Sequence, residues 1–493
     1  MGKPNILLIM SDQHRFDCLG AYGNKEIQTP HIDKLASDGT VYRNSFSAAP
    51  VCTPSRYSVL TGLYPHQHTG WANHATIPAP DKAFPEILRR NSYRTKAVGK
   101  MHLTPTYMNI GFEHLQLAEQ DGSGRYDDDY HRYLRQQGLV DGIDLIDQVS
   151  EYRKQAPKHY WDVFGAVESN LPEEHHSTTW IGNQALAALG EWGGEEPNFL
   201  MVSFIKPHHP FDPPAPWSQM YDAQHLTVLP GWTENCLQHD LQMNGGYFPN
   251  DQLTVDALKR AMALYYGSIS HIDGYVGQMM ELLKEKGLYD DTMIIYTSDH
   301  GEYLGFHHML LKSNHMYDPL VKVPLIIKYP GERNKMAYSD ELVNNIDLAP
   351  TLLKLADAQP DKHMAGIDLK TGTANRDYII CEGASSNQYM IRSQTHKLLY
   401  SRDQTNHLFF DLVKDPLELR NLYEDPEHRQ LIGEFKEDLL QFILFDAVTP
   451  THLNVEAAQI EAQNVPQNEA AQELKDWYRN KMESFELRSE EQS

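Results

Sequence analysis

The chain has 493 residues, of which 41% are hydrophobic and 22% are charged. This composition is typical of a globular protein and excludes a disordered or fibrous chain, and no apolar run is long enough to predict a membrane-spanning helix. The formal net charge of −24 argues against a nucleic-acid-binding protein, and it means that an anionic substrate would need a locally positive pocket.

The first residues of the chain and its cysteines indicate the cellular compartment in which we expect the protein. Residues 1–4 lead directly into an apolar segment, with neither the basic region nor the cleavage site of an export signal before it. We therefore expect a cytoplasmic location, or a periplasmic or secreted one if an export signal lies outside the sequence given. The four cysteines are too few to predict a disulfide framework; they are Cys18, Cys52, Cys236 and Cys381.

Short apolar runs alternate along the chain with segments of helical periodicity, which predicts an α/β fold. The predicted strands cover residues 6–10, 95–98, 199–205 and 292–297, and the predicted helices cover residues 32–39, 84–91 and 256–287. Polar residues follow the end of each predicted strand. Since a parallel sheet assembles its functional sites at the carboxyl ends of its strands, these polar residues are the first candidates for a site.

Two long segments between these elements, residues 121–174 and 213–250, show little periodicity, and we interpret both as insertions that shape the mouth of a pocket. Near residue 368 the pattern changes to short strands, at residues 378–381, 390–392, 397–400 and 408–411. The expected domains are residues 1–366, which would carry the site, residues 367–450 with a short antiparallel sheet, and an acidic helical tail over residues 451–493.

The most informative motif is Cys52-Thr53-Pro54-Ser55-Arg56, which continues to Leu60-Thr61-Gly62. It resembles the C-x-P-S-R-x-x-x-L-T-G signature of the type I sulfatases. The resemblance implies that a maturation enzyme oxidises Cys52 to formylglycine while the chain is unfolded. It also implies an alkaline-phosphatase-like fold, in which helices sandwich a large mixed sheet and a smaller C-terminal α+β subdomain follows. A bare C-x-P-S-R would be equally compatible with a buried free cysteine.

Formylglycine hydrates to a geminal diol, and this explains why a sulfatase uses it. A serine that attacked a sulfate ester would remain as a serine sulfate. In the diol, one hydroxyl attacks sulfur and expels the alcohol, and the second then loses its proton, so that the aldehyde re-forms as sulfate leaves. The reaction is covalent catalysis with a built-in release step.

Two pairs of residues match the metal-binding motifs of this family in order and context. Asp12 and Gln13 follow the first predicted strand, and Asp299 and His300 follow the last. Such oxygen donors suit a hard divalent cation, and a histidine is tolerated beside them. Many family members carry an aspartate in place of Gln13, and often an asparagine in place of His300. The resemblance implies Ca²⁺, with Mn²⁺ as the alternative because related phosphonate and phosphate monoester hydrolases share the Gln and His pattern.

The resemblance also implies the groups that would act on the sulfate and stabilise its charge in the transition state. These candidate catalytic residues are Cys52, Arg56, Lys100, His102, His208 and Lys312. Arg56 would hold the formylglycine hydroxyl. His208 would protonate the leaving alcohol as general acid, with His102 and Lys312 as competing candidates. Asp299 would orient the diol and accept its proton.

The sequence thus predicts a metal-dependent sulfuric ester hydrolase that acts on a sulfated saccharide or an aryl sulfate, with a formylglycine-generating maturation enzyme as partner and neither nucleic acid nor membrane. Two alternatives stay open. A phosphonate monoester or phosphodiester hydrolase would use the same nucleophile, and a non-enzymatic binding protein would keep the fold without the maturation. The residues expected to contact substrate or to serve only the scaffold are Trp71, Asn73, His74, Tyr107, His209, His307, His308 and His315.

Overall fold

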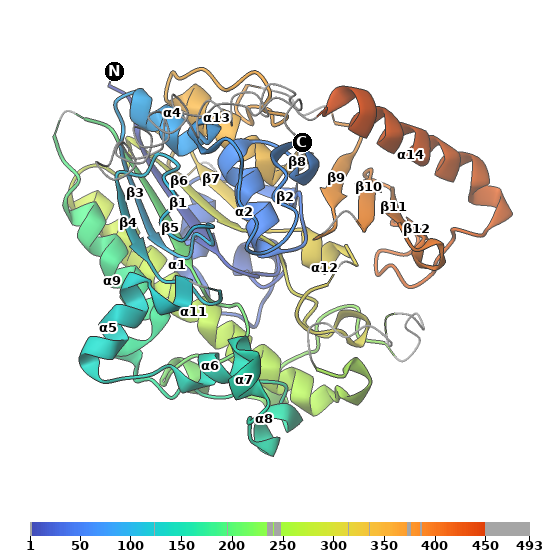
Figure 1. Cartoon of the computed structure of the whole chain (residues 1–493), viewed down its shortest axis with the longest axis horizontal. Helices are drawn as coiled ribbons and strands as arrows, with labels where there is room; N and C mark the ends of the chain where they lie inside the picture. Colours follow the sequence, from blue (N-terminus) through green and yellow to red (C-terminus); the bar gives the residue numbers. More distant parts are fainter. Residues whose placement is uncertain are drawn as a thin grey trace, which may run out of the picture. The chain divides into compact units, whose positions relative to one another are not determined.

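An eight-stranded mixed sheet forms the centre of the protein in its computed structural model (Figure 1), with strands in the order β4-β3-β5-β1-β6-β7-β2-β8. All strands run parallel except β7, which is antiparallel to both neighbours. The strands are β1 (Asn5–Ser11), β2 (Thr40–Phe46), β3 (Arg94–Gly99), β4 (His114–Leu117), β5 (Asn198–Phe204), β6 (Thr292–Ser298), β7 (Leu325–Lys328) and β8 (Ala337–Asn344). The structure describes residues 2–448 apart from residues 123, 195, 234–239, 241–247, 314, 335, 372–375 and 385–386.

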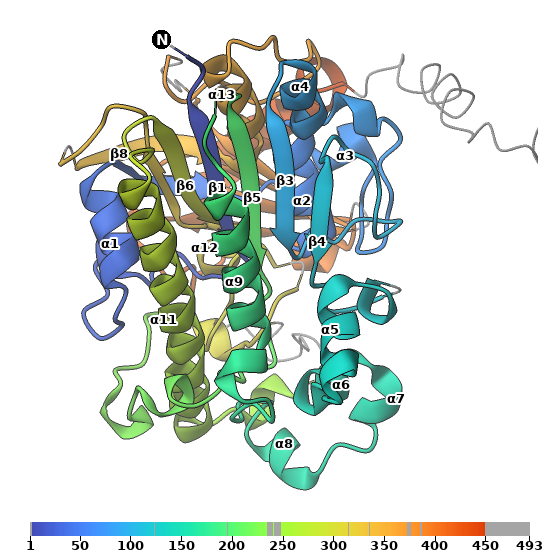
Figure 2. The same cartoon turned by 90° about the vertical axis from the view of Figure 1, so that its left-hand side faces the viewer.

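Helices cover both faces of this sheet (Figure 2). The helices on one face are α1 (Pro30–Ser37), α9 (Ser177–Gly190) and α11 (Val255–Glu285), and those on the other are α2 (Cys52–Thr61), α4 (Phe84–Arg90) and α13 (Leu348–Leu355). Two one-turn helices, α3 (Pro65–His68) and α12 (Asp318–Val321), are also present. The predicted α/β fold with a sandwiched mixed sheet is confirmed.

The alternation of side chains along each strand explains the two helical layers. Leu7 and Ile9 of β1 belong to the core on the side of α11, whereas Ile6 and Leu8 belong to the core on the side of α2. All four side chains are fully buried. A strand in the middle of a parallel sheet is covered on both faces, so its sequence is apolar throughout instead of alternating.

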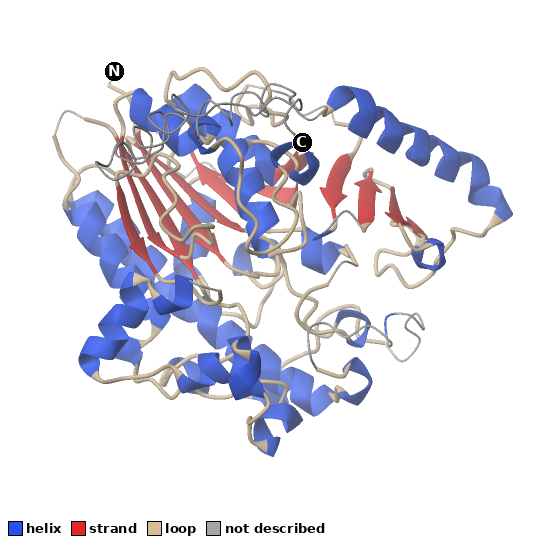
Figure 3. Ribbon diagram, viewed as in Figure 1, coloured by secondary structure: helices blue, strands red, loops and turns tan. Residues whose placement is uncertain are grey.

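A second, four-stranded antiparallel sheet follows near the C-terminal end of the described chain (Figure 3). Its strands are β9 (Ile379–Glu382), β10 (Gln388–Arg392), β11 (His396–Ser401) and β12 (Leu408–Asp411), which confirms the predicted short sheet. Ile432, Phe435 and Leu439 of α14 (Arg429–Gln441) pack in the core behind it. The expected domain boundary between residues 366 and 367 stays a prediction, and the expected tail over 451–493 lies outside the described residues.

The insertion over residues 121–174 contains helices that the sequence did not predict. They are α5 (Asp129–Gln137), α6 (Gly142–Gln148), α7 (Ser150–Arg153) and α8 (Lys158–Asp162). Asp128 and Asp141 cap the first two by accepting backbone N–H groups. Helices of 4 to 9 residues are too short for a clear apolar period. Across the described part of the chain, every helix is too short or too polar to traverse a bilayer.

Candidate active site

Four neighbouring strands bring polar residues to one edge of the large sheet. β3, β5, β1 and β6 are adjacent and parallel, and Ser11 at the end of β1 pairs with Phe204 of β5 and with Ser298 of β6. The residues that follow these strands are therefore held at one level, at the carboxyl ends where α/β sheets form their sites. They are Asp12 and Gln13, Lys100 and His102, His208, and Asp299 and His300.

Cys52 reaches the same edge as the first residue of α2, where its side chain is buried. The other residues of the signature explain this position. Ser55 Oγ donates a hydrogen bond to the backbone carbonyl of Asp299 at 2.5 Å, and Gly62 ends the helix with a φ of 66°, which glycine adopts without strain. The N-terminus of a helix carries partial positive charge, so α2 favours negative charge on residue 52.

The guanidinium of Arg56 joins two buried carboxylates beside Cys52. Its Nε lies 2.8 Å from Asp299 Oδ2, and its Nη2 lies 3.0 Å from Asp12 Oδ2. Lys100 adds a second charge, with Nζ 2.8 Å from Asp12 Oδ2. Burial would raise the pKa of Asp12, but neighbouring cations led by Lys100 hold it far below its usual value. Both carboxylates are thus paired, as buried charges must be.

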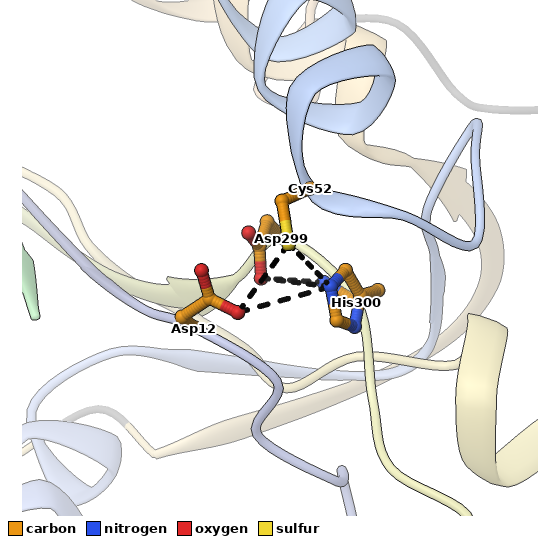
Figure 4. A group of neighbouring side chains, drawn as sticks. All are labelled: Asp12, Cys52, Asp299 and His300. Carbon is orange, nitrogen blue, oxygen red and sulfur yellow. Dashed lines mark hydrogen bonds and ion pairs between the residues drawn. The ribbon is translucent and has the colours of Figure 1, made fainter. Parts of the chain in front are cut away.

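The Cys52 sulfur lies among charged groups (Figure 4). Its Sγ is 2.8 Å from Lys312 Nζ, 3.2 Å from His300 Nε2 and 3.7 Å from Asp12 Oδ1. Although burial would raise the pKa of this thiol, Lys312 and Lys100 hold it well below its usual value. The site therefore stabilises negative charge at the position of Sγ, which is where a formylglycine hydroxyl would lie.

The structure brings the four predicted metal ligands together beside Cys52. They are Asp12, Gln13, Asp299 and His300. Oδ2 of each carboxylate faces Arg56, whereas Oδ1 of Asp12 and Oδ1 of Asp299 lie 3.8 Å and 3.9 Å from His300 Nε2. Gln13 Oε1 is buried and has no hydrogen-bond partner among the described residues. A buried oxygen without a partner is unfavourable, and a divalent cation bound with the two carboxylates would satisfy it. The donor set therefore fits such an ion.

Hydrogen bonds orient His300 and Gln13, the two predicted ligands that are not carboxylates. His300 Nδ1 lies 2.9 Å from the carbonyl oxygen of Gly301, so it donates there and leaves the Nε2 lone pair toward the site, as in many metal-binding histidines. Gln13 Nε2 donates to the carboxylate of Glu302, and the backbone N–H of Gln13 donates to Asp299 Oδ1 at 3.1 Å. The amide and imidazole are therefore held in place by the protein itself.

His208 and Lys312 form a pair over Cys52. Lys312 Nζ lies 2.9 Å from His208 Nε2, and His208 Nδ1 lies 2.6 Å from the carbonyl oxygen of His209. Burial and the charge of Lys312 lower the pKa of His208. The imidazole is consequently neutral. Its Nδ1–H donates a hydrogen bond to the carbonyl of His209, and its Nε2 accepts one from the Lys312 ammonium group.

His102 has the opposite protonation state because a carboxylate faces it. Its Nε2 lies 2.8 Å from Asp121 Oδ1, and its backbone N–H donates to Glu119 Oε1 at 2.9 Å. Burial would lower the pKa of His102, but Asp121 raises it to about 9. His102 is thus an imidazolium at neutral pH.

A cavity of about 240 Å³ opens onto Cys52. The residues already predicted from the sequence that line it are Gln13, Cys52, Asn73, Lys100, His102, His208, His209 and Lys312. Five others were missed by sequence reasoning, namely Gln120, Asp121, Asp147, Gln148 and Leu311. Four of the five lie in the 121–174 insertion or directly before it, so this insertion forms part of the cavity wall. Asp12, Arg56, Asp299 and His300 lie beneath the wall and are at most 1% exposed.

A family model described as sulfatase matches residues 4–358 of this chain. The chain belongs to the sulfatase family. It is therefore a sulfuric ester hydrolase, and its family in general uses a metal ion and a formylglycine made from cysteine. A second family model, described as N-sulphoglucosamine sulphohydrolase, C-terminal, matches residues 305–444 of this sulfatase.

Known proteins resemble this sulfatase over nearly its whole length. It is 31% identical over 476 residues to an arylsulfatase of Clostridium perfringens, a match that covers 89% of this chain and 94% of the relative. The solved phosphonate monoester hydrolase of Agrobacterium radiobacter is 24% identical, with a TM-score of 0.73 over 92% of this chain and 96% of that one. A structure in complex with its substrate D-glucosamine-2-N,6-O-disulfate is 21% identical, with a TM-score of 0.65 over 89% and 97% of the two chains. These two structures show the shared fold.

Several residues for which substrate contact and a scaffold role were both open do not line the cavity of this sulfatase; they are Trp71, His74, Tyr107, His307, His308 and His315. Two of these histidines contact the scaffold instead. His307 is fully buried, with Nδ1 2.7 Å from Asp240 Oδ2, and His308 stacks on Trp232 with ring centroids 3.9 Å apart. Both histidines therefore fit the scaffold role that the sequence had left open.

Replacing Asp121 with asparagine should move the alkaline limb of the pH profile of this sulfatase to lower pH. The Asp121 carboxylate raises the pKa of His102 to about 9 against the lowering effect of burial, so its loss lets the imidazolium deprotonate at a lower pH. We expect the alkaline pKa of kcat/KM to fall by about one unit or more. Asp127→Asn, at an exposed carboxylate paired with Arg132, is the control, and an unshifted limb in Asp121→Asn would contradict a role for the His102 proton.

Proposed function

We propose that this sulfatase hydrolyses a sulfate monoester of a small saccharide or an aryl alcohol, after a maturation enzyme has converted Cys52 to formylglycine. The observation that carries the proposal is the position of Cys52 at the N-terminus of α2. Lys312 Nζ lies 2.8 Å from Cys52 Sγ, and Lys100 forms an ion pair with the neighbouring Asp12. Positive groups preorganised around the nucleophile would stabilise the charge that develops on sulfate oxygens. The similarity to an arylsulfatase and to a protein solved with a sulfated sugar supports the two substrate classes.

The formylglycine hydrate, when formed at residue 52, supplies two hydroxyl groups on one carbon. Lys312 and His102 would donate hydrogen bonds to the oxygens on residue 52 and on the bound sulfate. His208 would protonate the oxygen of the leaving alcohol, and Lys312 would supply that proton, because its Nζ lies 2.9 Å from His208 Nε2. This arrangement keeps His208 as general acid although its resting state is neutral.

One divalent cation would be held by Asp12, Gln13, Asp299 and His300. When bound, such a cation polarises a sulfate oxygen and favours ionisation of the hydroxyl on residue 52. We propose Ca²⁺ because three of the four ligands offer oxygen, with Mn²⁺ as the alternative because His300 offers nitrogen. Arg56 and Lys100 would keep the two carboxylates in place on the side away from the ion.

Adding Ca²⁺ to chelator-treated protein is expected to raise its melting temperature. A cation that binds only the folded protein stabilises it by about 2.7 kcal/mol at 100 times its dissociation constant. Gln13→Asp adds one negative charge to the site and should strengthen the response to both cations. Scanning calorimetry measures both effects without turnover. Gln430→Asp, on the exposed face of α14, is the control; a wild-type protein whose melting responds to neither cation would refute the metal assignment.

The proposed function is tested by co-expressing the chain with a formylglycine-generating enzyme and measuring rates on 4-nitrophenyl sulfate and phenyl phosphonate. Mass spectrometry of the Cys52 peptide should show the sulfur and two hydrogens replaced by one oxygen. We expect a higher kcat/KM for the sulfate ester. The Gln13 and His300 pattern favours phosphonate hydrolysis as the second candidate function, and faster phosphonate turnover would establish that one instead. Converted protein inactive on both compounds would exclude the aryl sulfate and the phosphonate as substrates.

A further inference from the structure

We infer that this sulfatase acts on a small, singly sulfated alcohol whose leaving group is uncharged or carries an amine, and that it discriminates against leaving groups with a second anionic group. The inference rests on the proposed function and specifies its substrate. It comes from the charges, the hydrogen-bonding atoms and the volume of the cavity above Cys52.

Two of the positive groups that line the cavity are lysines beside Cys52 and Asp12, and a third, the His102 imidazolium, is paired with Asp121 at 2.8 Å. Lys312 Nζ lies 2.8 Å from Cys52 Sγ, and Lys100 Nζ lies 2.8 Å from Asp12 Oδ2. These are the only lysines among the described residues that line the cavity, and none of those residues is an arginine. One sulfate group would therefore use the two lysines, and a second anionic group would find no further lysine or arginine among the described residues of the wall.

The wall of the cavity also carries carboxylates and amides. The Asp121 carboxylate lines the cavity and is 25% exposed. The Asp147 carboxylate also lines it and lies 2.6 Å from His209 Nδ1. Asp147 is only 1% exposed, so Asp121 is the carboxylate that a second anionic group would meet. The pairing of Asp121 with His102 leaves no free positive charge there to attract such a group, and a like charge beside Asp121 would disfavour binding.

Gln148 presents an acceptor to the leaving group. Its Nε2 donates to Asp147 Oδ2 at 2.5 Å and to the carbonyl oxygen of His209 at 3.0 Å. These bonds fix the amide, and its Oε1 accepts no hydrogen bond from the described residues. Asn73 is the complementary case, since its Oδ1 accepts from the Thr53 backbone N–H at 3.1 Å and leaves the Nδ2 group as the donor. Hydroxyl and ammonium groups suit this set, because both can donate to Gln148 Oε1.

The volume of the cavity and the net charge of the chain also favour a small substrate with a single anionic group. The cavity of about 240 Å³ is smaller than the roughly 300–1,000 Å³ of sites that enclose drug-sized ligands. It has room for a sulfate and about one ring. The chain as a whole carries 67 acidic and 43 basic residues, so its mean field repels polyanions. The negative charge of the chain therefore disfavours a highly sulfated or uronate-rich polymer as substrate.

The test uses three phenyl sulfates with closely similar leaving groups, carrying hydroxymethyl, aminomethyl or carboxymethyl at the para position. The matured protein should show a kcat/KM for the first two at least about tenfold above that for the carboxymethyl compound. The ratio should shrink when ionic strength is raised, because salt screens the repulsion. A carboxymethyl compound that is hydrolysed as fast as the hydroxymethyl compound at low salt would overturn the inference.

Gln148→Lys provides the reciprocal test. A cation at this position should raise kcat/KM for the carboxymethyl compound relative to the aminomethyl compound by about tenfold, whereas Gln148→Met, which is similar in length and uncharged, should not invert the order. An unchanged ratio in a folded Gln148→Lys protein would count against the role of this wall. If converted protein hydrolyses none of the three compounds, the proposed hydrolysis of aryl sulfates fails. Hydrolysis of all three at equal rates would instead leave that function intact and overturn the inference about charge.

Discussion

Replacing Cys52 with alanine is expected to lower kcat by roughly four orders of magnitude or more, as the loss of the nucleophile does in other hydrolases. The side chain is 1% exposed and begins α2, and alanine is well tolerated in helices, so the melting temperature should change little. Lys100, Lys312 and His102 stay in place, and the variant should still bind a sulfate ester. Calorimetric binding and steady-state rates measured on the same preparation separate the two properties, and retained turnover would exclude Cys52 as the nucleophile.

Cys52→Ser gives a sharper result when it is expressed without a maturation enzyme. Its single hydroxyl lies where Lys312 and the helix N-terminus stabilise negative charge, so it can attack sulfur once. It has no second hydroxyl to expel the sulfate. We expect a burst of no more than one alcohol per protein, with the mass of the peptide that contains residue 52 increased by one sulfo group. Sustained turnover by this variant would show that release does not require the diol.

Arg56→Ala is expected to have the largest effect on stability, about 3–5 kcal/mol in the free energy of unfolding, because removing one partner of a buried ion pair leaves uncompensated charge. Its guanidinium contacts Asp12 at 3.0 Å and Asp299 at 2.8 Å, and all three side chains are at most 1% exposed. Activity should be lost as well, because the same carboxylates belong to the proposed metal site. Denaturant unfolding measures the stability change.

Arg56→Lys separates charge from geometry. Lysine restores one positive charge but cannot bridge two carboxylates as a planar guanidinium does, so it should recover part of the stability and little of the activity. Arg333→Ala removes an arginine from an exposed pair with Asp290 and should cost about 1 kcal/mol or less. Equal stability of Arg56→Ala and Arg333→Ala would mean that the buried bridge contributes nothing.

The floor of the site could be predicted from the sequence because the geometry of a parallel sheet is regular. Asp12 and Asp299 are far apart in sequence, yet each follows an apolar strand directly, and neighbouring parallel strands end at the same level. Cys52 could be recognised from the motif around it. The structure adds the reason for that motif, since Ser55 and Arg56 both contact Asp299.

The wall of the cavity could not be predicted in the same way. Asp121 and Gln148 lie in an insertion of short helices held by local caps and polar contacts, and no repeat in the sequence relates them to Cys52. The strands β2 and β8 were also missed. β8 is exposed over most of its first half, and Arg43 and Asn44 interrupt the apolar pattern of β2, so neither shows the apolar run of the central strands.

The pairing of β1 with β6 has a consequence for the newly made chain. Ser11 and Ser298 are 287 residues apart, and Ser55 and Arg56 take their native partner from Asp299, just beyond β6. At translation rates of about 5–20 residues per second, the ribosome needs roughly 10–50 s to pass from α2 to the end of β6. Throughout that interval the Cys52 segment lacks the contacts that bury it. The late arrival of one central strand would thus give the proposed maturation enzyme time to reach the thiol before the protein closes over it.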